Sequence, residues 1–158
     1  MPEMSLTGFI AHLAGFQMRL AEAEHKALEH AAKLVEAEAK REVGHYQDAA
    51  GPFQAWPELA DATKADRLKH GFSENDPLLR TGEMRDSIGH AIGDKEAAIG
   101  SNNDKAVWQE LGTSSVPPRS FLGAAGVRKS EEVAEILGMA PVIALVGHSV
   151  SGKLTRSD

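Results

Sequence analysis

The chain has 158 residues, of which 42% are hydrophobic and 25% charged, and this suits one globular domain with a single core. Its formal net charge of −6 argues against stable binding to nucleic acid, because proteins that neutralise phosphates usually carry a basic excess. The sequence has no cysteine, which excludes disulfides and thiolate metal sites.

The N-terminus has no secretory signature, since Glu3 stands where a signal peptide would carry basic residues. No apolar run approaches the ~20 residues needed to cross a bilayer. The longest such run, 140–147, is far too short. We therefore expect a protein made and used in a cytoplasm, with no membrane partner.

One long helix is expected from Ser5, its N-cap, to about Val43, with Gly44 as the stop. Its apolar residues recur at steps of three and four and trace one stripe. A helix of this length measures roughly 55–60 Å, more than so small a domain can cover. It is therefore either broken near Gly15 or covered in part by a neighbouring subunit. Its second half holds three Glu–Lys pairs in the favourable i,i+4 order: Glu22/Lys26, Glu29/Lys33 and Glu36/Lys40.

Shorter elements follow. Helices are expected over 61–70, 105–111 and 130–137, the last with Ser130 as its cap and Glu131 and Glu132 in its first turn. The runs 87–92 and 97–100 flank Gly93-Asp94 and predict a β-hairpin. Val116–Arg119 should be extended, because each proline disfavours helix in the residue before it.

The predicted fold class is α+β: a long N-terminal helix packed on a small antiparallel β-sheet, with short helical insertions and a C-terminal helix. Residues 1–147 should form this single domain. Residues 148–158 are small and polar, and we expect them to be a flexible C-terminal tail.

Two motifs near the C-terminus resemble catalytic signatures but are incomplete. Gly147–Lys153 matches the first seven positions of a phosphate-binding P-loop, yet Leu154 stands where Ser or Thr should hold the metal. The same stretch approaches a nucleophile elbow, but Ser151 replaces its second glycine. We interpret both matches as chance.

Histidines and paired carboxylates do not assemble into a site either. His25 and His30 are five apart, which points them to different sides of a helix. The remaining histidines are expected on the surface (His12) or near loops: His45, His70, His90 and His148. Glu131-Glu132 and Glu22/Glu24 should be solvated faces, because neighbouring helical residues do not face each other. No catalytic residue, metal or cofactor site is therefore expected.

A series of turn and anchor residues between 78 and 122 is more informative. Gly82 can take the positive φ of a tight turn that starts a strand, and Gly112 can cap a short helix. In the extended segment, Arg119 and Phe121 should point to the same face. We expect Phe121 to be a core or interface anchor, and we expect Arg119 to pair with Glu110.

Four sequence segments stand here in a fixed order: Leu-Leu-Arg-Thr-Gly-Glu-Met-Arg-Asp-Ser-Ile, Gly-Ser-Asn, Gln-Glu-Leu-Gly-Thr and Pro-Pro-Arg-Ser-Phe-Leu. With an upstream Trp-Pro-Glu-Leu segment, they resemble the tail-completion (head–tail joining, neck) proteins of tailed bacteriophages over residues 56–122. The chain departs from that pattern at Lys105–Trp108, where family members have Tyr-Ala, and at Ser120, where they have proline. The motif residues carried over as interface candidates are Arg80, Thr81, Gly82, Arg85, Ser87, Ile88, Glu110, Gly112, Thr113, Pro117, Pro118, Arg119, Phe121 and Leu122.

The resemblance implies a non-enzymatic structural protein of the virion that joins the tail to the DNA-filled head and needs no cofactor. Its partners would be copies of itself in a ring, commonly of six and in some neck layers of twelve, together with the connector or head-closure protein and the tail tube or tail terminator. DNA would pass through the lumen without specific binding, which suits an acidic wall. The alternatives are another assembly part (a head-closure protein or tail-assembly chaperone) or a small cytoplasmic nucleotide-binding or hydrolase domain.

Overall fold

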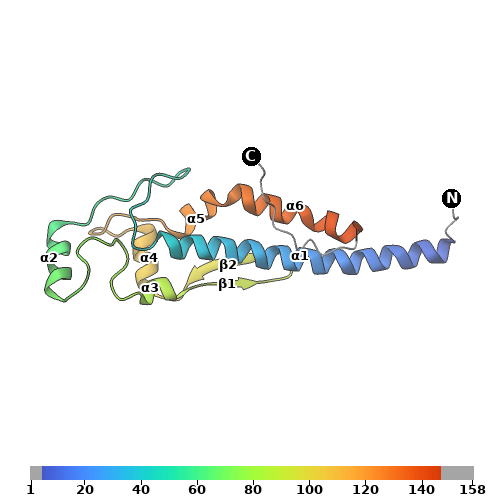
Figure 1. Cartoon of the computed structure of the whole chain (residues 1–158), viewed down its shortest axis with the longest axis horizontal. Helices are drawn as coiled ribbons and strands as arrows, with labels where there is room; N and C mark the ends of the chain where they lie inside the picture. The colour runs from blue at the N-terminus through green and yellow to red at the C-terminus, as the bar shows by residue number, and fades with distance from the viewer. Residues whose placement is uncertain (1–4, 147–158) are drawn as a thin grey trace.

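The computed structural model describes residues 5–146 and has the predicted α+β fold, built along one helix (Figure 1). Helix α1 (Leu6–Glu42) runs along the long axis of the molecule. The hairpin of β1 (Ile88–Ile92) and β2 (Ala97–Ser101) and the helix α6 (Ser130–Val146) lie along it, on opposite sides in this view. The shorter helices lie toward the end where α1 finishes: α2 (Asp61–Lys69), α3 (Glu83–Asp86), α4 (Asp104–Leu111) and α5 (Leu122–Arg128).

The long helix is confirmed, and it is continuous through Gly15 rather than broken there. The Ser5 side chain accepts a hydrogen bond from the Gly8 amide at 3.1 Å, and Gly44 follows the helix with a φ of +95°. All three expected Glu–Lys pairs form, at 2.5–2.6 Å. With 37 residues, α1 is about 55 Å long.

Helix α6 covers only part of α1. The two helices run antiparallel, and the Arg19 guanidinium donates a 3.0 Å hydrogen bond to the carbonyl of Ala144, near the end of α6. Beyond this point α1 continues alone toward its N-terminus, as Figure 1 shows. The residues before Arg19 therefore project from the body of the protein.

The hairpin is also confirmed, with Ile88 opposite Ser101 and Ile92 opposite Ala97. Alternate residues of β1 face α1, since successive side chains of a strand point to opposite sides. His90 was expected near a loop, and this was wrong. It lies in the middle of β1, where its Nδ1 contacts the Glu36 carboxylate of α1.

Near the motif segments the structure contains two helices that the sequence did not predict. Gly82 has the expected positive φ, +89°, but it leads into the single turn α3 instead of directly into a strand. Helix α5 was missed because its sequence, Leu-Gly-Ala-Ala-Gly-Val-Arg, contains two helix-weakening glycines and no local cap.

The C-terminal helix α6 is longer than predicted. It continues to Val146 instead of ending at Leu137, even though Pro141 removes one of its backbone hydrogen bonds. Ala140 and Ala144 are buried against α1 on either side of the proline, and this packing carries the helix past it. Ser130 does not act as the expected cap, because its hydroxyl donates to the Val127 carbonyl at 2.8 Å.

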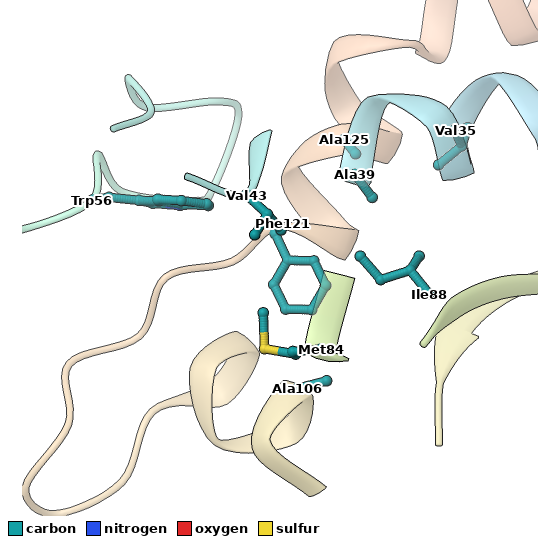
Figure 2. Close-up of a cluster of buried hydrophobic side chains, with 9 residues drawn as sticks. All are labelled: Val35, Ala39, Val43, Trp56, Met84, Ile88, Ala106, Phe121 and Ala125. Atoms are coloured by element: carbon teal, nitrogen blue, oxygen red, sulfur yellow. The ribbon is translucent and has the colours of Figure 1, made fainter. Parts of the chain in front are cut away.

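The main core lies where α1, the hairpin, α4 and α5 meet (Figure 2). Phe121 is fully buried there and points toward Met84 and Ile88. Trp56 and Val43 lie near the base of the same ring. The predicted helices at 61–70 and 105–111 are present as α2 and α4. The predicted tail, 148–158, and the P-loop-like segment lie outside the described residues, among which no helix is long and apolar enough to cross a membrane.

Candidate functional site

The Glu110 carboxylate of α4 joins two of the motif segments, 109–113 and 117–122, by accepting four hydrogen bonds. The Ser120 hydroxyl donates at 2.6 Å, and the backbone amides of Phe121, Leu122 and Gly123 donate at 2.8–2.9 Å. These amides open α5, whose N-cap residue Phe121 has no capping side chain, and the Ser120 hydroxyl accepts from the next amide, that of Ala124, at 3.3 Å. A negative charge at the positive end of a helix, bonded to its free amides, stabilises that helix. Glu110 therefore caps α5 from a different element.

Arg119 does not pair with Glu110 as expected. Its guanidinium is buried and donates to the carbonyl oxygens of Pro57, at 2.8 and 3.0 Å, and Glu58, at 3.0 Å. The burial lowers the pKa of Arg119. On the same segment, the Trp56 indole donates a 3.0 Å hydrogen bond to the Ser120 carbonyl. The loop around residues 56–58 is thus hydrogen-bonded to the motif segment at Arg119 and at Ser120. We call Trp56, Glu110, Arg119, Ser120 and Phe121 the motif node.

A second buried arginine was missed by the sequence interpretation. Arg67 of α2 donates to the Ser73 carbonyl at 2.6 Å and to the Leu79 carbonyl. It fixes the segment that leads into the first motif. No local pattern marks it, because its acceptors are main-chain oxygens that any sequence provides. Beside it, Arg80 lies over the ring of Phe72, 4.8 Å from its centroid.

The carried-over motif residues fall into three groups by exposure. The buried ones are Gly82, Ile88, Arg119 and Phe121. The partly buried ones are Arg85, Ser87, Glu110, Gly112 and Leu122. The exposed ones are Arg80, Thr81, Thr113, Pro117 and Pro118. The buried group holds the fold together, so a partner could touch only side chains of the exposed group and of the partly buried group, such as Arg85. Their role in an interface remains a prediction.

Gly112 shows why one motif position needs glycine. Its φ is +75°, and a Cβ there would lie 2.9 Å from the nitrogen and Cδ of Pro118. The loop then closes on Thr113, whose hydroxyl accepts from the amides of Ser115 and Val116 at 3.2 and 3.1 Å. The exposed prolines are therefore held against the end of α4.

Helix α4 also presents an apolar patch to solvent, which the sequence interpretation did not identify. Val107, Trp108 and Leu111 are each more than half exposed. We call them the α4 patch. The sequence did contain a signal for this patch. At 105–108 the chain departs from the tail-completion pattern and places Trp108 directly before the Gln-Glu-Leu-Gly-Thr segment. An exposed tryptophan flanked by aliphatic side chains is typical of a contact surface.

A buried charge cluster lies where α1 ends beside α5. Glu42 is fully buried, and Arg128 donates to one of its oxygens, while the other has no partner among the described residues. Arg128 also donates to the Asp48 carbonyl at 2.6 Å. Burial raises the pKa of Glu42 to about 7, and the hydrogen bond from Arg128 only partly offsets this. One turn earlier, the hydrogen bond from Arg41 lowers the pKa of Glu38.

Stability should therefore fall as the pH rises. The folded pKa of Glu42 exceeds its ordinary value of 4.5, so its contribution is complete below about pH 4.5 and is lost as the pH rises through about 7. We expect urea unfolding to give a free energy roughly 1–3 kcal/mol lower at pH 8 than at pH 5. Glu42→Gln should remove this slope. An equal slope in both proteins would mean that Glu42 is not the source of the pH dependence.

Side chains that could bind a metal do not cluster in the part of the chain that the structure describes. Among residues 5–146, no group of three or more His, Asp or Glu side chains could hold a metal ion. The paired carboxylates behave as expected: Glu22 binds Lys26, and Glu132 binds Lys129 at 2.8 Å.

Comparison of the sequence and the structure with protein-family models, curated proteins and solved structures finds no match.

Proposed function

We propose that this protein is a non-enzymatic structural component of a phage virion, located at the head–tail junction. It would form a homo-oligomeric ring that joins the tail to the DNA-filled head. DNA would pass through the ring without specific binding, as the acidic net charge favours.

The observation that carries this proposal is the convergence of the motif segments on the motif node. Residues from 56, 110 and 119–121 are far apart in sequence, yet they bond to one another around the buried ring of Phe121. A chance scatter of turn residues would have no reason to meet in this way. Residues that bond to one another in the folded protein depend on each other, and this mutual dependence is what keeps the segments of a sequence motif together.

Light scattering tests the proposal most directly. The mass of the purified protein should be a multiple of the chain mass, alone or after mixing with candidate connector and tail-tube proteins. Mass spectrometry of purified virions should also detect the protein. A tail-assembly chaperone would be absent from virions. A monomer that ignores these partners would contradict the proposal.

The α4 patch is the surface that we assign to a neighbouring neck protein. Trp108→Ala should weaken partner binding by roughly 2 kcal/mol, or about 30-fold, if the tryptophan is the anchor of that contact. Stability should change by no more than about 0.5 kcal/mol, because the side chain is exposed. Isothermal calorimetry with the connector and tail-tube proteins measures the first effect. An unchanged affinity for both would remove the α4 patch from the proposal.

A further inference from the structure

The projecting part of α1 carries an apolar stripe that no other described element covers. Leu6, Phe9, Ile10 and Leu13 are 75, 48, 58 and 45% exposed. Their spacing places them on one face of the helix. Together they expose several hundred Å² of apolar surface, the size at which a patch on a monomer usually marks a contact. We call these four residues the α1 stripe.

The α1 stripe continues a face that is already buried further along the same helix. Ala23 and Ala27 lie at the same helical positions and pack against Ala140 of α6. The interface between α1 and α6 therefore stops because α6 ends, while the apolar pattern of α1 continues. A helix that keeps its pattern beyond its own partner is suited to a second one.

A groove of matching character lies further along α1, where α5, α6 and β2 meet that helix. It has a volume of about 620 Å³, and its apolar walls include Val35, Ile99, Leu122, Val133 and Leu137. No charged residue lines it. Gly126 leaves space in it, because a Cβ built there would meet no atom within 4 Å. Grooves of this kind accept one apolar face of an amphipathic helix.

The α1 stripe cannot enter the groove of its own chain. Leu13 and Val35 lie on one continuous helix, roughly 33 Å apart along its axis. Residues 147–158 are poor candidates to cover the stripe, since their only large apolar residues are Val150 and Leu154. A second copy of the chain supplies a groove that the stripe of the first copy can reach. Both surfaces are apolar, since residues 6–20 contain no charged side chain except Arg19 and no charged residue lines the groove.

We infer that the α1 stripe of one copy docks in the groove between α5, α6 and β2 of the next copy. Such a contact joins two different surfaces, so it propagates head to tail and closes into a ring or extends as a filament. The total area buried would be on the order of 1,000 Å², the lower end for a specific contact. Assembly should therefore depend on concentration and gain from ring closure. This inference does not rest on a place in the virion.

Blocking each surface separately tests the contact without disturbing the fold. Leu13→Glu places a charge on the stripe, and Gly126→Leu fills the groove at a position with free space. Each variant should lower the mass measured by light scattering to that of the single chain, with an unchanged circular dichroism spectrum. Ala11→Glu, on the opposite face of α1, is the matched control and should assemble as the native protein does.

Cysteine crosslinking identifies the pairing, since the native chain has no cysteine. Two single variants, Leu13→Cys on the stripe and Ala134→Cys in the groove, are mixed with a short bismaleimide. We expect a crosslinked pair in this mixture, several-fold more than from Ala11→Cys with Ala134→Cys. Crosslinking of Leu13→Cys only to itself would overturn the assignment to the groove. A native protein that stays monomeric up to high concentration would overturn the inference as a whole, whereas absence from virions would overturn only the proposed function.

Discussion

Phe121→Ala should destabilise the protein by about 3–5 kcal/mol, because it removes the largest fully buried side chain of the main core. The ring is fully buried between α1, α4 and the hairpin, and Met84 and Ile88 lie against it (Figure 2). The backbone around the cavity is tied by the hydrogen bonds of Glu110, so it cannot easily collapse. Urea unfolding followed by circular dichroism, at one fixed protein concentration, measures the change.

Trp108→Ala is the matched control for this prediction. It also removes an aromatic ring within the motif region, but from an exposed position, so stability should change by no more than about 0.5 kcal/mol. If the two variants lost similar free energy, Phe121 would not be the centre of the core. A loss below about 1 kcal/mol for Phe121→Ala would mean that the cavity collapses or fills with water.

The parts of the fold that were predicted correctly depend on local patterns. A regular apolar stripe and an N-cap were enough to place α1 within a residue at each end. Gly93-Asp94 between two short apolar runs was enough for the hairpin. In each case the residues that decide the structure are neighbours in sequence, so their spacing carries the information.

The parts that were missed depend on contacts between distant residues. Helix α5 takes its cap from Glu110, more than ten residues earlier, and α6 passes Pro141 because α1 packs against it. Neither effect leaves a local trace. The predicted pairing of Arg119 with Glu110 was wrong for a related reason. Their opposite charges suggested an ion pair. Instead, Arg119 donates to main-chain carbonyl oxygens and Glu110 accepts from main-chain amides.

The structure separates the motif residues into those that form the core and those that are exposed. Phe121 was expected to be a core or interface anchor, and it is a core residue. Arg119 and Gly82 are buried as well. They therefore support the neighbouring surface residues and would not touch a partner themselves. The exposed candidates are instead Arg80 and the threonines and prolines of the loops, and the structure adds the apolar α4 patch. Sequence resemblance alone could not separate these two roles.

Glu110→Ala should cost about 3 kcal/mol, a large effect for a residue that is only partly buried. It leaves the Ser120 hydroxyl and three backbone amides without their acceptor, and amides bonded to a charged group contribute more than neutral pairs do. Glu110→Gln should cost less, about 1–2 kcal/mol, because its amide oxygen still accepts while its NH₂ faces two donors. Glu74→Ala removes an exposed glutamate and should leave stability unchanged within about 0.5 kcal/mol.

The position of the amides whose hydrogen exchange speeds up in Glu110→Ala shows whether Glu110 acts as a helix cap or as a general surface charge. If Glu110 caps α5, hydrogen exchange in Glu110→Ala should speed up first at the amides of Leu122 and Gly123, which lose their acceptor. The amides in the middle of α1 should follow only with global unfolding. Uniform acceleration across both helices would mean that Glu110 stabilises the whole core rather than α5. Because α5 forms one wall of the groove, local fraying should also weaken the docking of the α1 stripe, and Glu110→Ala should therefore lower the assembled mass at protein concentrations where the monomer remains folded.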